Sequence, residues 1–264
     1  MTLSLFQVDA FTNRLFAGNP AAVCPLDVWL PDEQMQQIAA ENNLAETAFY
    51  VSQGERFGLR WFTPSVEVDL CGHATLATAY VLFHQYHYPQ STLAFDTRSG
   101  ILTVEKSGER LVMDFPSDLA SPSEVSASVL AGLGDVQPVA TLRGKSDYLI
   151  VLDNQSQLEL VQPDFRKLGE DINTRAVIVT APGAEAGVDF VSRCFAPAAG
   201  IDEDPVTGSA HTTVTPYWAQ RLGKTTLTAR QLSTRGGTLY CTHEGSRTKI
   251  AGEAVLYLHG NIEL

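Results

Sequence analysis

The chain lacks the features that mark several large classes of protein. No run of about 18 apolar residues, the length of a membrane span, occurs in its 264 residues. Its four cysteines are scattered singly without a CxxC pair, which argues against a zinc ribbon or a disulfide scaffold and fits a reduced cytoplasm. The first residues lack a basic leader and are typical of a strand. We therefore expect a cytoplasmic protein that does not associate with membranes.

Positive charge is also scarce. Lysine and arginine number 18 against 30 acidic residues, a formal net charge of −12, and the basic residues form no cluster. Without such a cluster the chain cannot replace the counterions of a phosphate backbone, so we predict no nucleic-acid partner. The sequence contains no GxGxxG, Walker, GxSxG or HExxH motif. His84 and His87 are spaced like metal ligands, but no third ligand is suggested, and we predict no metal site.

A repeat is the most informative feature that is present. Residues 60–64 recur as residues 193–197, and residues 71–75 recur as residues 207–211. Each copy runs from a strand pattern through a proline-containing loop into glycine, small residues and an apolar stretch. The repeat predicts two like-built halves facing each other across a cleft. We place the domains at 1–116 and 117–264, with a return of the last few residues to the first half left open.

Local signals predict several elements. Pro31 opens a helix that has Met35, Ile38 and Ala39 on one face. Residues 101–106 pair with residues 111–115 as a hairpin. A capping box at Ser121 predicts a second helix with proline as its first residue.

The two repeated segments predict two further helices. Residues 73–83 are apolar on nearly all sides, which is typical of a helix buried all round. The second copy predicts a helix from near Gly208 to about Leu222, which Pro216 should kink or shorten.

Both repeated helix starts expose backbone N–H groups that suit an anion. Gly72, His73, Gly208 and Ser209 would offer such groups to a substrate carboxylate. The alternative for either motif alone is that glycine and alanine merely allow close packing. Because both halves keep the helix opening, we favour a pair of anion-binding sites.

Three titratable residues could carry chemistry. Glu46 stands where a loop gives way to an apolar strand, and its alternative is an ordinary exposed acid. Asp204 precedes the second helix start, where acids are also routine caps. His73 could donate a hydrogen bond or transfer protons, although a lone histidine at a helix start is more often structural. Glu67 and Asp69 are interpreted as solvated.

Several motifs together resemble one family. They are Gly18-Asn19-Pro20-Ala21-Ala22-Val23, Ala45-Glu46-Thr47-Ala48-Phe49, Phe62-Thr63-Pro64, Cys71-Gly72-His73-Ala74-Thr75 and Glu203-Asp204-Pro205-Val206-Thr207-Gly208-Ser209-Ala210. In order and over nearly the whole chain, these motifs resemble the phenazine-biosynthesis-like (PhzF-like) isomerases. The resemblance implies an α+β fold of the diaminopimelate-epimerase type. In it, two similar domains each wrap a barrel-like mixed sheet round a central helix, with the active site in the cleft between them.

The resemblance also implies an activity and its residues. It implies an enzyme without cofactors, often a homodimer, that moves a proton within a small unsaturated or cyclic carboxylic acid. Glu46 falls on the family's proton-transferring glutamate, and His73 and Asp204 fall on active-site positions. Asn19 is a further expected substrate contact. Ala45 stands where many relatives carry serine.

Two alternatives remain open at this stage. One is an epimerase or dehydratase of an amino or imino acid that depends on Cys71. Related two-base epimerases use a thiol on each face of the substrate, but here the second thiol position is Thr207. A threonine hydroxyl cannot serve as the matching base at neutral pH, which disfavours a two-thiol racemase. The other alternative is a protein that binds small acids without catalysis.

Overall fold

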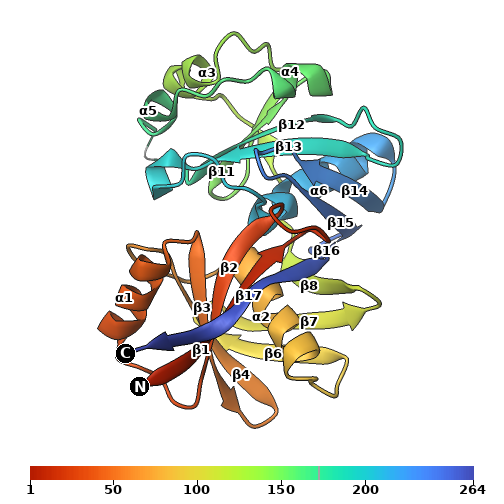
Figure 1. Ribbon diagram of the computed structural model, residues 1–264. Helices are drawn as coiled ribbons and strands as arrows, with labels where there is room; N and C mark the ends of the chain where they lie inside the picture. The colour runs from red at the N-terminus through yellow and green to blue at the C-terminus, as the bar shows by residue number, and fades with distance from the viewer. Residues whose placement is uncertain (172) are drawn as a thin grey trace. The chain divides into compact units, whose positions relative to one another are not determined.

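The computed structural model describes residues 1–171 and 173–264 (Figure 1). The chain divides into two compact units, one formed by residues 1–114 with 251–264 and the other by residues 115–250. Each unit combines a mixed β-sheet with helices, as the α+β class requires. In the described residues, no helix is both long and apolar enough to cross a membrane.

The first unit is built on a mixed sheet. Its strands are β1 (Thr2–Ala10), β2 (Asn19–Leu26), β3 (Glu46–Gln53), β4 (Arg56–Phe62), β5 (Glu67–Val68), β6 (Thr92–Thr97), β7 (Gly100–Ser107), β8 (Arg110–Pro116) and β17 (Ala254–Glu263). β1 pairs antiparallel with both β17 and β2, while the β2–β3 and β4–β6 pairs are parallel. The predicted hairpin is present, with Val104 opposite Met113 in β7 and β8. The C-terminal strand thus closes the first unit.

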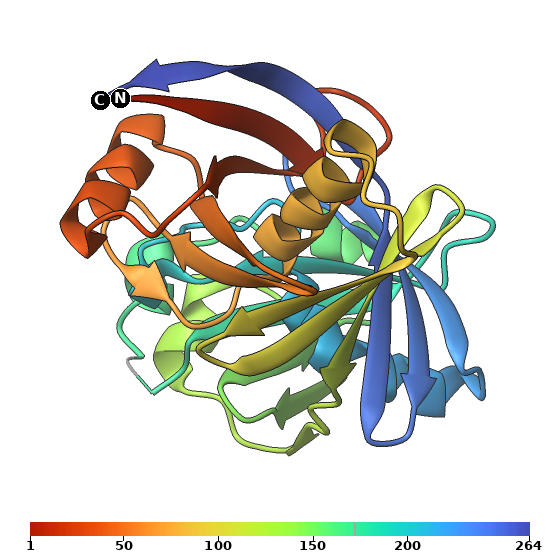
Figure 2. The same cartoon turned by 90° about the horizontal axis from the view of Figure 1, so that it is seen from below.

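A buried helix runs through this sheet. Helix α2 (Gly72–Tyr80) continues as a π-helical turn, η1 (Val81–Gln85), and every residue from Gly72 to Ala79 is buried. It packs against β1, β2, β3 and β17 (Figure 2). The prediction of a helix buried all round is therefore confirmed. Helix α1 (Asp32–Asn42) lies outside, and it buries the predicted Met35, Ile38 and Ala39.

The second unit is a mixed sheet with helices on both faces. Its strands are β9 (Ser121–Pro122), β10 (Ala140–Arg143), β11 (Asp147–Val151), β12 (Ala176–Pro182), β13 (Phe190–Phe195), β14 (Thr226–Gln231), β15 (Gly237–Glu244) and β16 (Arg247–Gly252). Pairing is parallel for β11–β12 and β13–β14 and antiparallel for β12–β13 and β14–β15.

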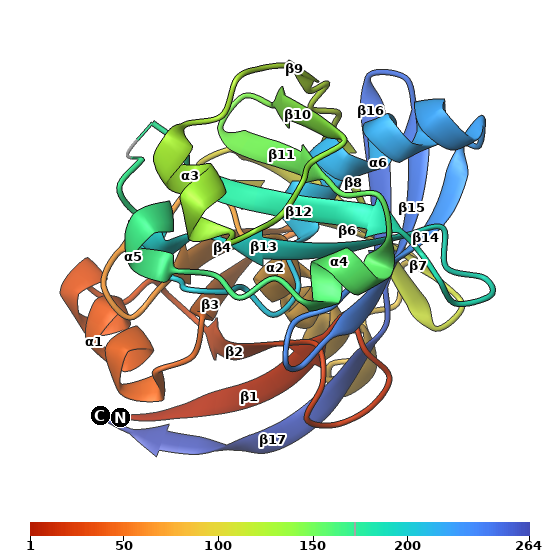
Figure 3. The same cartoon turned by 90° about the horizontal axis from the view of Figure 1, so that it is seen from above.

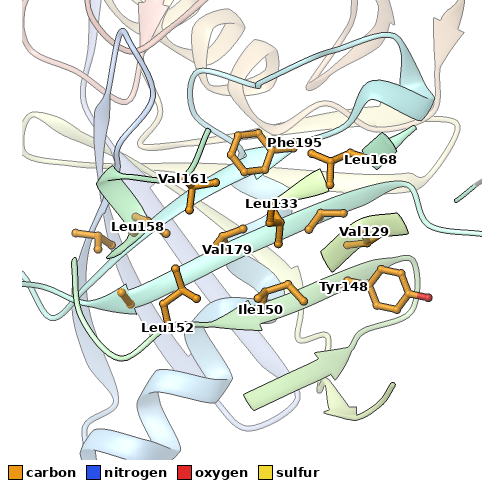
Figure 4. Packing of buried hydrophobic residues seen from close by; sticks show 13 residues of the cluster. Val129, Leu133, Tyr148, Ile150, Leu152, Leu158, Val161, Leu168, Val179 and Phe195 are labelled. Carbon is orange, nitrogen blue, oxygen red and sulfur yellow. The ribbon is translucent and has the colours of Figure 1, made fainter. Parts of the chain in front are cut away.

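Three short helices cover one face of this sheet. They are α3 (Ala127–Gly132), α4 (Gln155–Glu159) and α5 (Phe165–Leu168) (Figure 3). Their apolar side chains form one core with those of β11, β12 and β13, including Val129, Leu158 and Val179 (Figure 4). Thr180, next along β12, accepts a hydrogen bond from Trp218 of α6 (Gly208–Leu222) at 2.9 Å. Because side chains alternate along a strand, α6 packs on the opposite face.

Pro216 does not shorten α6, contrary to the expectation. The helix continues unbroken to Leu222 with Pro216 inside it. A proline at this position frees the carbonyl oxygen of Thr212, four residues earlier. The backbone N–H of Asp118 donates to that oxygen at 3.1 Å, so the freed acceptor is satisfied from outside the helix.

The helix predicted from the capping box is also wrong in position. Ser121 and Pro122 form β9, which pairs with Leu142 and Arg143 of β10. The helix begins five residues later, at Ala127, where the Ser126 hydroxyl accepts from the Val129 N–H at 3.4 Å. Sheet pairing has overridden a local capping signal.

The sequence repeat has a structural cause. In the first copy Arg60 makes two contacts of 2.7 Å with Glu67, and in the second Arg193 contacts Glu203 at 2.7 and 2.9 Å. Each guanidinium also lies over a ring two residues later in its strand, Phe62 or Phe195. Each bidentate pair ties the strand to the loop that enters the central helix. Glu67 is therefore a buried structural partner, and the interpretation of it as solvated is wrong.

Candidate active site

The first unit brings together most of the candidate residues. Glu46 is the first residue of β3 and pairs in register with Ala21 of β2, and Asn19 lies two residues earlier on the same strand. Because residues two apart on a strand share a face, Asn19 lies on the Glu46 face. Both residues are buried, Asn19 completely and Glu46 with 8% exposed. Glu46 is therefore not the exposed loop acid of the alternative.

His73 lies between a carboxylate and a thiol. Its Nε2 is 3.2 Å from a carboxylate oxygen of Glu46, and its Nδ1 is 3.5 Å from the Sγ of Cys71. The three residues come from the start of β3 and the start of α2. Cys71 is the N-cap of α2 but makes no side-chain cap hydrogen bond, so its thiol is directed to the imidazole instead.

Burial keeps the imidazole of His73 neutral. Its pKa is lowered from 6.5 to about 3, mainly because desolvation penalises the charged form, while a hydrogen bond to the backbone of Pro20 acts in the opposite direction. Proline has no N–H, so the partner is the Pro20 carbonyl, and His73 donates to it. A neutral imidazole has only one N–H, and the other ring nitrogen therefore carries a lone pair.

The same burial makes stability sensitive to acid. His211 in α6 also has a lowered pKa, about 4, because of desolvation. Both histidines take up a proton more readily when unfolded, so their stabilising effect is complete above about pH 6.5 and is lost as pH falls towards 3 to 4. We expect the free energy of unfolding to drop by up to about 1.4 kcal/mol per pH unit for each histidine. Urea denaturation between about pH 5 and pH 7 measures this slope.

A variant tests the assignment of the slope. His211→Gln should unfold with a shallower dependence on pH than the native chain, since one of the two groups no longer titrates. An unchanged slope would mean that other groups control acid unfolding.

The second unit holds a polar network at the start of α6. The Thr207 hydroxyl donates to the Asp204 carboxylate, and the Thr207 N–H donates to the Gln231 side chain at 2.8 Å. The Gln231 amide in turn donates to the Asp204 carbonyl at 2.8 Å. Gly208 and Ser209 follow as the first two helical residues. The network fixes Asp204 beside the helix start, and Thr207, the second thiol position of the related epimerases, is engaged with Asp204.

Sequence reasoning missed Arg175. Its Nη1 donates to the Ser209 hydroxyl at 3.2 Å, and its Nε donates to Asp147 at 2.9 Å. Asp147 is almost fully buried, whereas the Arg175 side chain is 46% exposed. The hydrogen bonds with Asp147 raise the pKa of Arg175, so the guanidinium stays charged. The candidate substrate contact Ser209 therefore lies beside an anchored cation.

One cluster could hold a metal ion. Glu46, Cys71 and His73 each offer a ligand atom, and these atoms lie within 4.8 Å of one another. The pair considered from the sequence, His84 and His87, is not part of it. The structure thus groups Asn19, Glu46, Gly72 and His73 in the first unit, and Asp204, Gly208 and Ser209 in the second. That the two groups serve a single active site between the halves stays a prediction.

Solved structures of the same fold indicate the class of protein. A PhzF-family protein from Enterococcus faecalis has a TM-score of 0.96 at 46% identity, covering 100% of both chains. A structure described as a predicted epimerase from Pseudomonas aeruginosa, at 18% identity, shares the fold alone, with a TM-score of 0.74 over 98% of this chain and 99% of that one. The predicted epimerase-like fold is confirmed.

Sequence comparison then identifies the family. The family model described as phenazine biosynthesis-like protein (PhzC-PhzF) matches residues 8–260. A curated relative named as an uncharacterized isomerase of Pseudomonas aeruginosa is 54% identical over 265 residues, with 100% of both chains covered. The chain belongs to the phenazine biosynthesis-like (PhzF) family and is an isomerase. The alternative of an acid-binding protein without catalysis is therefore wrong.

Proposed function

We propose that the protein moves a proton within a small unsaturated or cyclic carboxylic acid, with Glu46 as the single acid and base. The observation that carries this proposal is the buried carboxylate of Glu46, whose oxygen lies 3.2 Å from Nε2 of His73. A buried carboxylate held beside an imidazole is suited to general acid–base work.

The neutral state of His73 assigns the proton to Glu46. With a pKa of about 3, the imidazole does not hold an extra proton near neutral pH. The ionised carboxylate takes a proton from an acidic carbon, and the electron pair left on that carbon shifts the double bond. The same carboxyl group then returns the proton to another carbon on the same face. Atoms and charge balance without a second base.

The remaining residues are proposed to hold the substrate. The backbone N–H groups at Gly72, Gly208 and Ser209 stabilise a carboxylate, because helix starts attract anions. Neither helix start has a side-chain cap hydrogen bond to its N-cap residue. Asp204 and Asn19 are proposed to hold an amino or hydroxyl group of the substrate.

Arg175 is expected to strengthen binding of the substrate carboxylate. Its fork is anchored on Asp147 and reaches Ser209, which suits bidentate recognition of a carboxylate. Arg175→Gln should raise KM by about 10-fold or more and change kcat little. Steady-state kinetics measures both constants.

A matched variant controls for surface charge. Arg166 is an exposed arginine of α5, and Arg166→Gln should leave KM unchanged. Equal effects of the two variants, or an unchanged KM for Arg175→Gln, would rule out the contact.

The alternative is an epimerase or dehydratase that depends on Cys71. The specific observation in its favour is the thiol Sγ 3.5 Å from His73 Nδ1. Turnover that survives in Cys71→Ser but not in Glu46→Gln supports the carboxylate mechanism. The reverse result supports the thiol. Screening small cyclic and unsaturated acids supplies the substrate for both assays.

A further inference from the structure

Three different ligand types converge at the start of α2. A carboxylate oxygen of Glu46, the Sγ of Cys71 and a ring nitrogen of His73 lie within 4.8 Å of one another, and all three residues are buried. The set combines a thiol, an imidazole and a carboxylate, which are the three ligand types of protein zinc sites.

The spacing is close to that of a zinc site. Usual zinc–ligand bond lengths place two ligand atoms of a tetrahedral site about 3.3 to 3.6 Å apart. The distance of 3.5 Å between Cys71 Sγ and His73 Nδ1 already has this value. The Glu46 carboxylate lies nearer the other ring nitrogen, at 3.2 Å, so it has to move by about an ångström to join them.

The surroundings also suit a divalent ion. Zinc-binding histidines usually donate their other ring N–H to a carbonyl or carboxylate, and here the Pro20 carbonyl accepts such a hydrogen bond. A thiolate and a carboxylate together neutralise a divalent charge in a buried place. The thiol favours Zn²⁺ over Mg²⁺ or Ca²⁺, which prefer oxygen ligands.

We propose that Glu46, Cys71 and His73 bind one Zn²⁺ reversibly and that the bound ion inhibits the enzyme. On binding, the Cys71 thiol loses its proton to solvent, and bonds form from the metal to sulfur, nitrogen and oxygen. A fourth position is left for water or a substrate carboxylate. Inhibition rests on the proposed function, because the ion occupies the carboxylate that moves the proton. Ion binding does not rest on it.

Cobalt titration tests the site without any substrate. Chelator-treated protein is titrated with Co²⁺ alone, and a thiolate-to-cobalt absorption band in the near ultraviolet should saturate at one ion per chain. Zn²⁺ should then displace the cobalt. Cys71→Ser should lose the band, and both Cys71→Ser and His73→Gln should bind Zn²⁺ at least about 100-fold more weakly. Circular dichroism confirms that each variant is folded.

A matched control removes an imidazole outside the cluster. His84 lies at the end of α2 and stacks on Tyr80, so His84→Gln should bind the ion as the native chain does. Absence of the band in the native protein, or native affinity in Cys71→Ser, overturns the site and leaves the role of Glu46 untouched. Binding of one ion without loss of turnover overturns the inhibition and counts against Glu46 as the base.

Discussion

Replacing Glu46 by glutamine is expected to lower kcat by about 10²-fold or more while the substrate still binds. The amide keeps the shape of the side chain but cannot accept the proton, and His73, neutral down to a pH of about 3, cannot take its place. Steady-state kinetics measures the loss, and calorimetry with the same substrate measures binding.

Two further measurements make this test specific. Glu41 is an exposed acid in the neighbouring helix α1, and Glu41→Gln should turn over at the native rate. In deuterated water the product should acquire deuterium if the proton on Glu46 exchanges before its return. Native turnover in Glu46→Gln would exclude the carboxylate mechanism whatever the isotope result.

The parts of the fold that the sequence predicted are those with a local cause. The apolar surface of residues 73–83 is sufficient to predict a buried helix, and the repeated glycines mark where α2 and α6 begin. The catalytic assignment of Glu46 came from the family resemblance, because a single glutamate before a strand has no distinctive local pattern. Burial of that residue could be seen only in the folded chain.

The parts that it could not predict depend on contacts between distant segments. Arg175 meets Asp147 because parallel pairing of β11 and β12 sets Asp147 opposite Ala176, the neighbour of Arg175. Pro216 is tolerated because Asp118 donates to a carbonyl nearly a hundred residues away in sequence. The histidine–thiol–carboxylate cluster likewise forms only when β3 lies beside the start of α2. Neither periodicity nor capping signals contain this information.

The turn that leads into the site imposes a second large expectation, on stability. Gly18 has a φ of +67°, and a Cβ atom there would lie 2.2 Å from the backbone oxygen of Ala10 and 2.7 Å from the Thr12 side chain. A backbone atom cannot move aside as a flexible side chain can. Gly18 also directly precedes Asn19 and Pro20, which face Glu46 and His73, so a shifted turn displaces the site.

Gly18→Ala should therefore lower the free energy of unfolding by about 3 kcal/mol or more, through left-handed strain and steric overlap together. Gly54 separates the two effects. It has a φ of +79° but open space around its Cβ position, so Gly54→Ala should cost only about 1 kcal/mol. Urea denaturation of both variants measures the difference, and turnover should fall in Gly18→Ala alone. Equal destabilisation of the two would show that the turn at Gly18 relaxes around a methyl group, and that the close approach to Ala10 does not hold Asn19 and Pro20 in place.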